Sequence, residues 1–419
     1  MAGGSRRRAE RVLVAIQTGD VRAAGTHPEP SAASHSAWHL RGLTVISLAH
    51  GVSDFYSGAV PFIIFFVVTR AHLSPAYQGA LGFVWYLTSS IVQPLFGAYS
   101  DRRGRWWFMP SAILLTVVAV SCAGVANSLP ALVACIVAGG LGSAIMHPEA
   151  GKYSAMLSGA RRAGGISIFQ IGGQIGYAAG PAVVAVLLAR YGGTGTLVLA
   201  APGALAAAIL FVAMRRVDRT AVRAHKAAAV AARGGAVDRF GVTLLVASTG
   251  LRYFTTAAFM TYLPNLLVAR GATLPAAGQI VSAFLLVSAF GLLAGGYLAD
   301  RYGAVAVSVA SLCGAVPCLL AFFALGGWPA LVPLLLASVL LAVQNAPGVA
   351  LVQSMLPRNL GMALGLMNGV AFGAGSALVA VVGLLVARLG AGASLEAVAF
   401  APLVAAAPYL AVRRRRHEP

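Results

Sequence analysis

Long apolar runs alternate with short polar connectors along most of this chain. Six runs lie in the first half of the sequence, at about 43–69, 77–99, 107–127, 130–151, 164–189 and 194–214. Six more lie in the second half, at about 241–269, 276–298, 304–326, 329–352, 361–388 and 392–412. A helix needs about 20 apolar residues to cross a bilayer, and these runs lack the period-2 alternation of barrel strands. The pattern therefore predicts an all-α membrane protein with twelve transmembrane helices.

Composition supports lipid as the main solvent of the chain. Hydrophobic residues make up 59% of the 419 residues and charged residues only 10%, whereas soluble domains carry about 25% charged residues. We attribute the net charge of +19 to basic membrane loops and expect no nucleic-acid partner. The runs contain no Ser/His/Asp set and no metal-ligand spacing, so we expect neither an enzyme nor a cofactor or metal site. The four cysteines, all inside apolar runs, are interpreted as packing residues: Cys122, Cys135, Cys313 and Cys318.

Lysine and arginine concentrate in every second connector. They lie in the first 41 residues, in segments 102–105, 152–162 and 215–239, at Arg301 and Arg358, and in segment 413–416. The opposite connectors hold only Arg70, Arg190, Arg270 and Arg388. Basic connectors face the cytoplasm by the positive-inside rule. We therefore expect a multi-pass protein of the plasma membrane with both termini in the cytoplasm.

The two halves of the chain repeat each other at one fixed separation. Asp101-Arg102 recurs as Asp300-Arg301, and the same separation places Gly51 over Gly250, His147-Pro148-Glu149 over Ala346-Pro347-Gly348, and Gly176 over Gly375. Two parallel repeats are typical of transporters whose site lies between the halves. The predicted parts are a disordered cytoplasmic tail (1–40), a first six-helix bundle (41–214), a basic cytoplasmic linker (215–240), a second bundle (241–412) and a basic tail (413–419).

The charged connectors carry a family resemblance. Gly97, Asp101, Arg102, Gly104 and Arg105 match the Gly-x3-Asp-Arg-x-Gly-Arg connector of the major facilitator superfamily, and the chain resembles that family over about 43–412. The second copy matches at Gly296, Asp300, Arg301 and Gly303, but Ala304 replaces the last arginine. The resemblance implies that both connectors latch the two halves together on the cytoplasmic side, with Asp101 and Asp300 docked on helix N-termini.

Within that superfamily the chain looks most like the fosmidomycin-resistance efflux proteins. The stretches that carry this likeness are His50–Asp54, His147–Glu149 and Ser167–Gln174. Gly176, Gly180 and Pro181 resemble a shortened antiporter motif of the superfamily, although close packing also explains the glycines. The resemblance implies drug/proton antiport and does not fix the substrate.

Asp54 is the only acid deep in any run. It lies about 16 Å into its helix at 1.5 Å per residue, and a charge at mid-membrane costs about 2.5–3.5 kcal/mol on insertion scales. We interpret Asp54 as a proton carrier, with a permanently paired structural acid as the alternative. His50 precedes it by one helical turn and shares its face, as a tuning or structural group.

Arg252 is the only cation deep in a run. It takes the place of Ser53 in the repeat, beside Tyr253, the counterpart of Asp54. A pair with Asp54, a fixed salt bridge between the halves, and a site for an anionic substrate group are open alternatives. A guanidinium suits carboxylate or phosphonate because its planar fork donates two parallel hydrogen bonds.

Other polar residues are secondary candidates. Glu149 and His147 flank Pro148 and join Asp54 and His50 as candidate proton-coupling residues. We favour Glu149 as the second protonation site, with an interfacial charge pairing with Lys152 or Arg161 as the alternative. The predicted cavity residues are Arg252, Tyr253, Gln170, Gln174 and Asn368.

We therefore predict a proton-coupled efflux transporter that works by alternating access as a functional monomer, with a small molecule, protons and lipid as partners. The alternatives are a facilitator or symporter for a small organic anion, and a non-transporting membrane sensor.

Overall fold

The computed structural model describes residues 40–103, 105–158, 162–215, 238–356, 362–363 and 365–417, without the side chains of 101–102, 162–164 and 413–417. The predicted tail up to residue 39 and the central part of the predicted linker lie outside these ranges. Within them every regular element is helical, so the all-α prediction is confirmed.

The helices follow the predicted runs. The first half contains α2 (Leu40–Arg70), α3 (Pro75–Tyr86), the π-helix η3 (Leu87–Ile91), α4 (Gln93–Arg103), α5 (Phe108–Ala123), α6 (Leu129–Leu157), α7 (Arg162–Tyr191), η4 (Gly192–Leu199) and α8 (Ala200–Arg215). The second half contains α10 (Arg239–Ala269), α11 (Leu274–Tyr302), α12 (Ala304–Ala324), η5 (Trp328–Ala330), α13 (Leu331–Val343), α14 (Asn345–Met355), the π-helix η6 (Gly365–Val370), α16 (Ala371–Ala377), α17 (Val379–Val398) and α18 (Ala401–His417). Each predicted run falls on one helix or on consecutive helical segments.

Length and polarity agree with membrane crossing. Seven stretches of the described helices are long and apolar enough to span a bilayer. Two of them, Gly165–Arg215 and Gly365–Val412, run for 51 and 48 residues, which is about twice the length that one crossing needs. The second is interrupted at Gly390, where φ is 79° and a side chain would be strained.

Short polar caps begin several helices. The side chains of Ser74, Ser128 and Thr273 accept hydrogen bonds from backbone N–H groups two or three residues ahead, and a proline follows in the first turn of each helix. A hydroxyl cap satisfies an otherwise free donor, and proline lacks the donor that would remain unpaired there.

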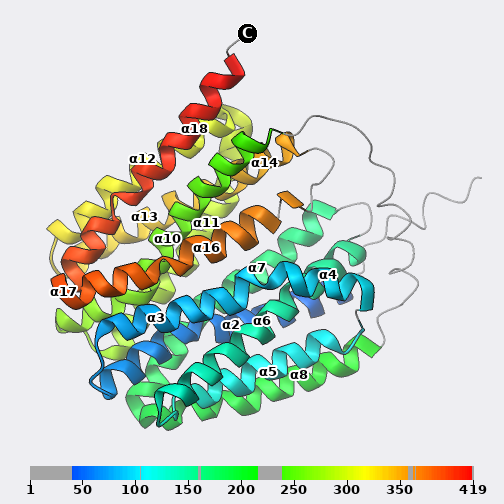
Figure 1. Ribbon diagram of the computed structural model, residues 1–419, viewed down its shortest axis with the longest axis vertical. Helices are drawn as coiled ribbons and strands as arrows, with labels where there is room; N and C mark the ends of the chain where they lie inside the picture. The colour runs from blue at the N-terminus through cyan, green and yellow to red at the C-terminus, as the bar shows by residue number, and fades with distance from the viewer. Residues whose placement is uncertain are drawn as a thin grey trace, which may run out of the picture.

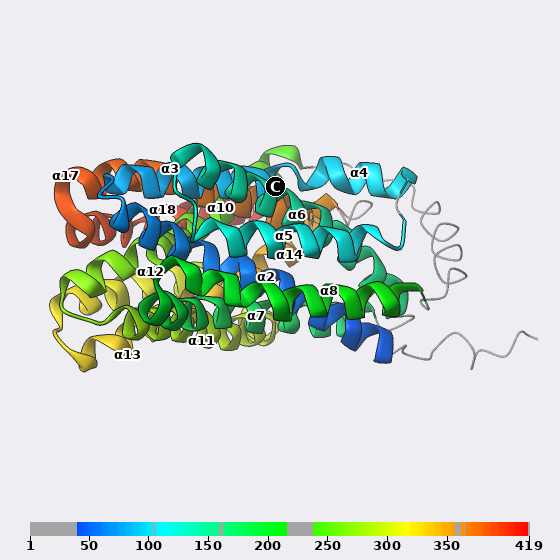
Figure 2. The same cartoon turned by 90° about the horizontal axis from the view of Figure 1, so that it is seen from below.

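The two halves form two bundles that converge at one end and diverge at the other (Figure 1). At the converging end α3 and α17 lie side by side in both views and are in contact (Figures 1 and 2). One hydrophobic cluster runs through the first half and continues into the converging end of the second. The diverging end of the second half has a separate cluster around Leu245, Met367 and Tyr409.

Glycines set equivalent helix contacts in the two halves. A Cβ on Gly176 of α7 would collide with the carbonyl oxygen of Gly51 in α2, and a Cβ on Gly375 of α16 would collide with that of Gly250 in α10. These two pairs occupy the same places in the sequence repeat. Gly176 therefore makes the close contact between helices that close packing, the alternative to an antiporter motif, predicts.

The described hydrogen bonds between the halves lie from the middle of the bundles to the converging end. Gln78 of α3 donates to the Thr261 carbonyl of α10 at 2.5 Å and exchanges hydrogen bonds with Asn265. The side chain of Gln174 and the backbone N–H of Ala182, both in α7, also donate hydrogen bonds to α11. Toward the diverging end, a Cβ added at Gly365 or Gly369 of η6 would meet no neighbouring helix among the described residues. These two glycines therefore set no close helix contact with the described residues in this conformation.

Candidate proton and substrate sites

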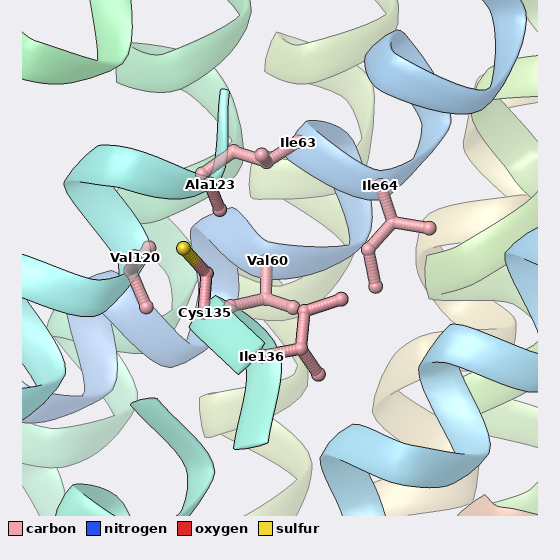
Figure 3. A pocket seen from close by; sticks show the side chains of 7 residues that line it. All are labelled: Val60, Ile63, Ile64, Val120, Ala123, Cys135 and Ile136. Carbon is pink, nitrogen blue, oxygen red and sulfur yellow. The ribbon is translucent and has the colours of Figure 1, made fainter. Parts of the chain in front are cut away.

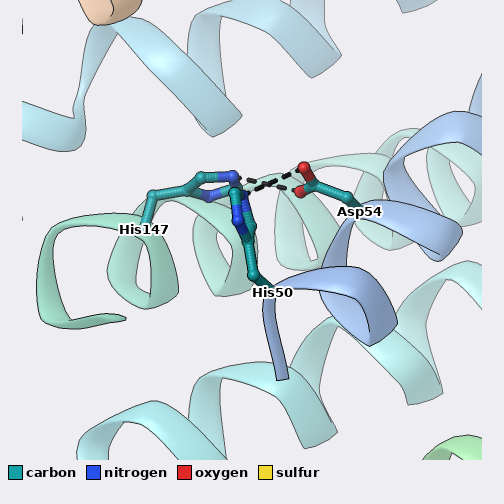
Figure 4. Close-up of side chains that lie close together, drawn as sticks. All are labelled: His50, Asp54 and His147. Carbon is teal, nitrogen blue, oxygen red and sulfur yellow. Dashed lines mark ion pairs between the residues drawn. The ribbon is translucent and has the colours of Figure 1, made fainter. Parts of the chain in front are cut away.

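Asp54 lies at the centre of a three-residue cluster that joins α2 to α6 (Figure 4). Its Oδ2 is 3.1 Å from Nε2 of His50, and its Oδ1 is 3.1 Å from Nε2 of His147. The side chains of His50, Asp54 and His147 are 6%, 15% and 26% exposed, so the cluster is buried on the His50 side and more open beside His147. We call these three residues the triad.

The packing of α7 fixes the position of His50. The ring of Phe169 stacks on the His50 imidazole with centroids 3.9 Å apart. A Cβ on Gly173 would collide with the same imidazole, so glycine leaves the room that the ring occupies. The imidazole of His147 meets that of His50 edge to face at 5.2 Å.

Both imidazoles are held in one tautomer by backbone carbonyls. Nδ1 of His50 lies 2.8 Å from the Phe169 carbonyl, and Nδ1 of His147 lies 2.8 Å from the Ser143 carbonyl. A carbonyl only accepts, so each Nδ1 carries a hydrogen. Each Nε2 then needs a further proton between itself and an Asp54 oxygen to make a hydrogen bond. The closed triad therefore has places for two exchangeable protons.

Imidazole and carboxylate groups are also ligands of divalent transition metals, and the three groups lie within 4.8 Å of one another. The Nε2 atoms face separate carboxylate oxygens directly, at hydrogen-bonding distance. We therefore interpret the cluster as a network that holds protons, and the absence of a metal site stays a prediction.

Glu149 lies on the other side of α6 from His147. Its carboxylate is 3.2 Å from Nζ of Lys152 and accepts a hydrogen bond from Ser100 in α4. Of the two roles that the sequence leaves open, this geometry is that of the interfacial partner. His147, the other proton-coupling candidate on α6, is the residue that contacts Asp54.

Arg252 of α10 is 4% exposed, and its Cζ lies 3.6 Å from the centroid of the Tyr253 ring. The Tyr253 hydroxyl accepts a hydrogen bond from Asn345 in α14, and the ring meets Phe372 of α16 edge to face at 4.9 Å. Among the described residues no ion pair joins Arg252 to Asp54. Each of the two residues stays in its own bundle.

The remaining predicted cavity residues have different surroundings. Gln174 donates to the Leu285 carbonyl at 2.8 Å and to Ser288 at 3.1 Å, so in this conformation it joins α7 to α11. Gln170 is half-buried one turn earlier on α7. Asn368 is half-buried in η6, where π-helical turns are often functional.

The predicted latch is only partly described. Gly97 lies against Pro148 of its own bundle, with 3.5 Å from an added Cβ to the proline Cβ, and Gly296 is similarly near Ala346. Asp300 and Arg301 are exposed, as is Arg105. Gly303, at φ 87°, separates α11 from α12. Gly104 and the side chains of Asp101 and Arg102 lie outside the described residues.

Several site residues have no sequence signal of their own. Gly173 and Phe169 surround His50, and Tyr177 lies within electrostatic reach of Asp54, Tyr86 and Tyr253. Apolar and aromatic residues are common throughout the runs, so only the contact between helices distinguishes these.

A small apolar pocket lies apart from these sites, between α2, α5 and α6 (Figure 3). It is lined by Val60, Ile63, Ile64, Val120, Ala123, Cys135 and Ile136. It holds no group that could bind a polar substrate.

Two helical bundles that repeat each other around a buried polar centre define a secondary transporter of the membrane, not an enzyme. The chain belongs to the Major Facilitator Superfamily, whose family model matches residues 46–242 and 245–419. It is 28% identical to the Fosmidomycin resistance protein of Escherichia coli (strain K12), over 86% of this chain and 90% of the relative. It is also 28% identical to the Uncharacterized MFS-type transporter YfnC of Bacillus subtilis (strain 168), over 88% and 92%.

A solved structure shares the fold. The bacterial homolog to the human lysosomal transporter Spinster, in an inward-facing and occupied conformation, has a TM-score of 0.72 at 16% identity, over 90% of this chain and 96% of that chain. The predicted family and subfamily resemblance are confirmed.

Proposed function

We propose that the protein exports a small organic molecule from the cytoplasm in exchange for protons. The observation that carries the proposal is the triad, in which two imidazoles and one carboxylate share a proton-holding network inside the membrane. An unpaired charge at this depth is costly, so such residues are usually kept for transport or proton relay. The relative named for fosmidomycin resistance supports export of a drug-like compound.

The diverging end carries the basic connectors and is assigned to the cytoplasm by the positive-inside rule. The described state then opens toward the cytoplasm, and Asp300 is exposed there. We assign it to the stage at which the protonated triad is about to release its protons and the substrate enters. Closure of that end would re-form the latch contacts, and the converging end would open by rocking of the two bundles.

The test is a drug-susceptibility panel in an efflux-deficient host, with fosmidomycin included. Expression should raise resistance, and an ionophore that dissipates the proton gradient should restore drug accumulation. Asp54→Asn should abolish resistance at an unchanged amount of membrane protein, whereas Glu396→Gln, at an exposed acid, should leave it intact. Unchanged accumulation with the ionophore would contradict proton coupling, and full resistance in Asp54→Asn would remove Asp54 from the mechanism.

A second candidate is coupled uptake of a small organic anion, favoured by Arg252. A protonated triad and a buried guanidinium would both attract an anion. This attraction favours transport of the proton and the anion in the same direction. Right-side-out and everted vesicles separate the two functions, because uptake driven by an inward proton gradient supports import, and exchange against it supports export.

A further inference from the structure

Arg252 is a buried cation for which the described part of the chain offers no acid. Its Nε and Nη2 have no hydrogen-bond partner there, and the three described ion pairs involve other residues. The stacking on Tyr253 compensates for only part of the lost hydration. A buried guanidinium with free donors is costly unless an acceptor completes it.

The repeat places this arginine directly beside the counterpart of Asp54. Tyr253 corresponds to Asp54, Thr249 to His50 and Ala346 to His147. The hydrogen bond from Asn345 to Tyr253, at 3.3 Å, joins α10 to α14 as the contact between His147 and Asp54 joins α6 to α2. The second half therefore has the same architecture at this place, with a cation and hydrogen-bonding groups in place of an acid and imidazoles.

Aromatic side chains from both halves lie next to this place. Phe372 of α16 contacts the ring of Tyr253 at 4.9 Å and the ring of Tyr86, from α3, at 5.8 Å between centroids. Tyr86 is 2% exposed and supports Phe372 from behind, so the half-buried Phe372 is the ring that a ligand held by the guanidinium would meet. Such surfaces bind the apolar body of a small molecule, and a few polar groups set its orientation.

We propose that Arg252, Tyr253 and Asn345 bind the oxyanion head group of the transported molecule, a carboxylate or phosphonate, with its apolar body against Phe372. The free Nε and Nη2 lie on one edge of the guanidinium fork and suit two oxygens of one head group. This assignment rests on the proposed transport function, because the anion is the cargo.

The experiment measures binding to the purified full-length protein in detergent by calorimetric titration. The probes are phenylphosphonate, benzoate and the uncharged dimethyl phenylphosphonate. The wild type should bind both anions at least tenfold more tightly than the ester. Arg252→Gln should weaken anion binding at least tenfold, Arg252→Lys should be intermediate because it keeps the charge without the fork, and Arg190→Gln, at an exposed arginine, should bind as the wild type does.

Equal affinity for anion and ester, or unchanged anion binding in Arg252→Gln, would overturn the assignment. Failure of both Arg252 variants to fold would also overturn it, since the guanidinium would then have a partner inside the protein. Asp54→Asn removes the acid of the triad and leaves Arg252 in place, so anion binding by this variant tests the anion site separately from proton coupling. Anion binding that persists while the wild type shows no proton coupling would refute the coupling and leave the anion site standing.

Discussion

The proposed proton exchange allows the number of protons per transport cycle to be predicted from the hydrogen bonds of the triad. Nδ1 of His50 and Nδ1 of His147 each face a carbonyl at 2.8 Å, and each Nε2 faces one Asp54 oxygen at 3.1 Å. The two contacts at Asp54 need one proton each. Release of both at the cytoplasmic side predicts that two protons are exchanged for each substrate molecule.

The change that tests this count is His147→Gln. A glutamine amide can still donate to the Asp54 carboxylate, but it cannot titrate, so only the contact with His50 still needs a proton. Each coupled proton contributes about 1.36 kcal/mol per pH unit, which is a factor of ten in a concentration ratio. At a gradient of one pH unit the wild type should therefore sustain a substrate ratio of about 100-fold, and His147→Gln about tenfold.

The assay is substrate accumulation at static head in proteoliposomes, with the membrane potential held at zero and the pH gradient varied. Radiolabelled fosmidomycin is the first probe. His72→Gln, at an exposed histidine in the connector after α2, is the matched control and should retain the wild-type slope. A wild-type slope of one proton, or an unchanged slope in His147→Gln, would refute the count.

Two further predictions concern the latch and the packing of the first bundle. Asp101→Ala should impair transport more than Asp300→Ala, because Ala304 stands where the first connector has an arginine; comparison of initial transport rates at equal protein amounts checks this, and the opposite ranking would contradict it. Gly176→Ala should lower the thermal stability of the purified protein, since overpacking costs about 1–3 kcal/mol. Gly151→Ala, where an added Cβ meets nothing within 4 Å, should not lower it, and equal losses in both would contradict the packing argument.

The fold was predictable because the membrane imposes it. The lengths of the apolar runs, the low content of charged residues and the repeat of Asp101 at Asp300 can each be read from the sequence alone. All three indicate the same architecture. The shared face of His50 and Asp54 was also predictable, since residues four apart meet on one helix.

Contacts between helices were not predictable in the same way. His147 reaches Asp54 because α6 packs beside α2, and its spacing in sequence carries no sign of this. The sequence favours Glu149 as the second protonation site, yet α6 turns it toward Ser100 and Lys152. Side chains two positions apart point to nearly opposite sides of a helix, so only one of the two could face the triad.

The repeat explains how one architecture holds two different chemistries. The glycine contacts that set helix spacing are kept in both halves, at Gly51 with Gly176 and at Gly250 with Gly375. At the place these contacts frame, the first half has Asp54 and the second has Tyr253, whose ring supports Arg252. Backbone packing constrains Gly176 and Gly375, because a Cβ at either position would collide with a carbonyl oxygen, whereas the side chains that face the centre are free to differ. Proton handling in one half and anion binding in the other is the division of roles that such a duplication permits.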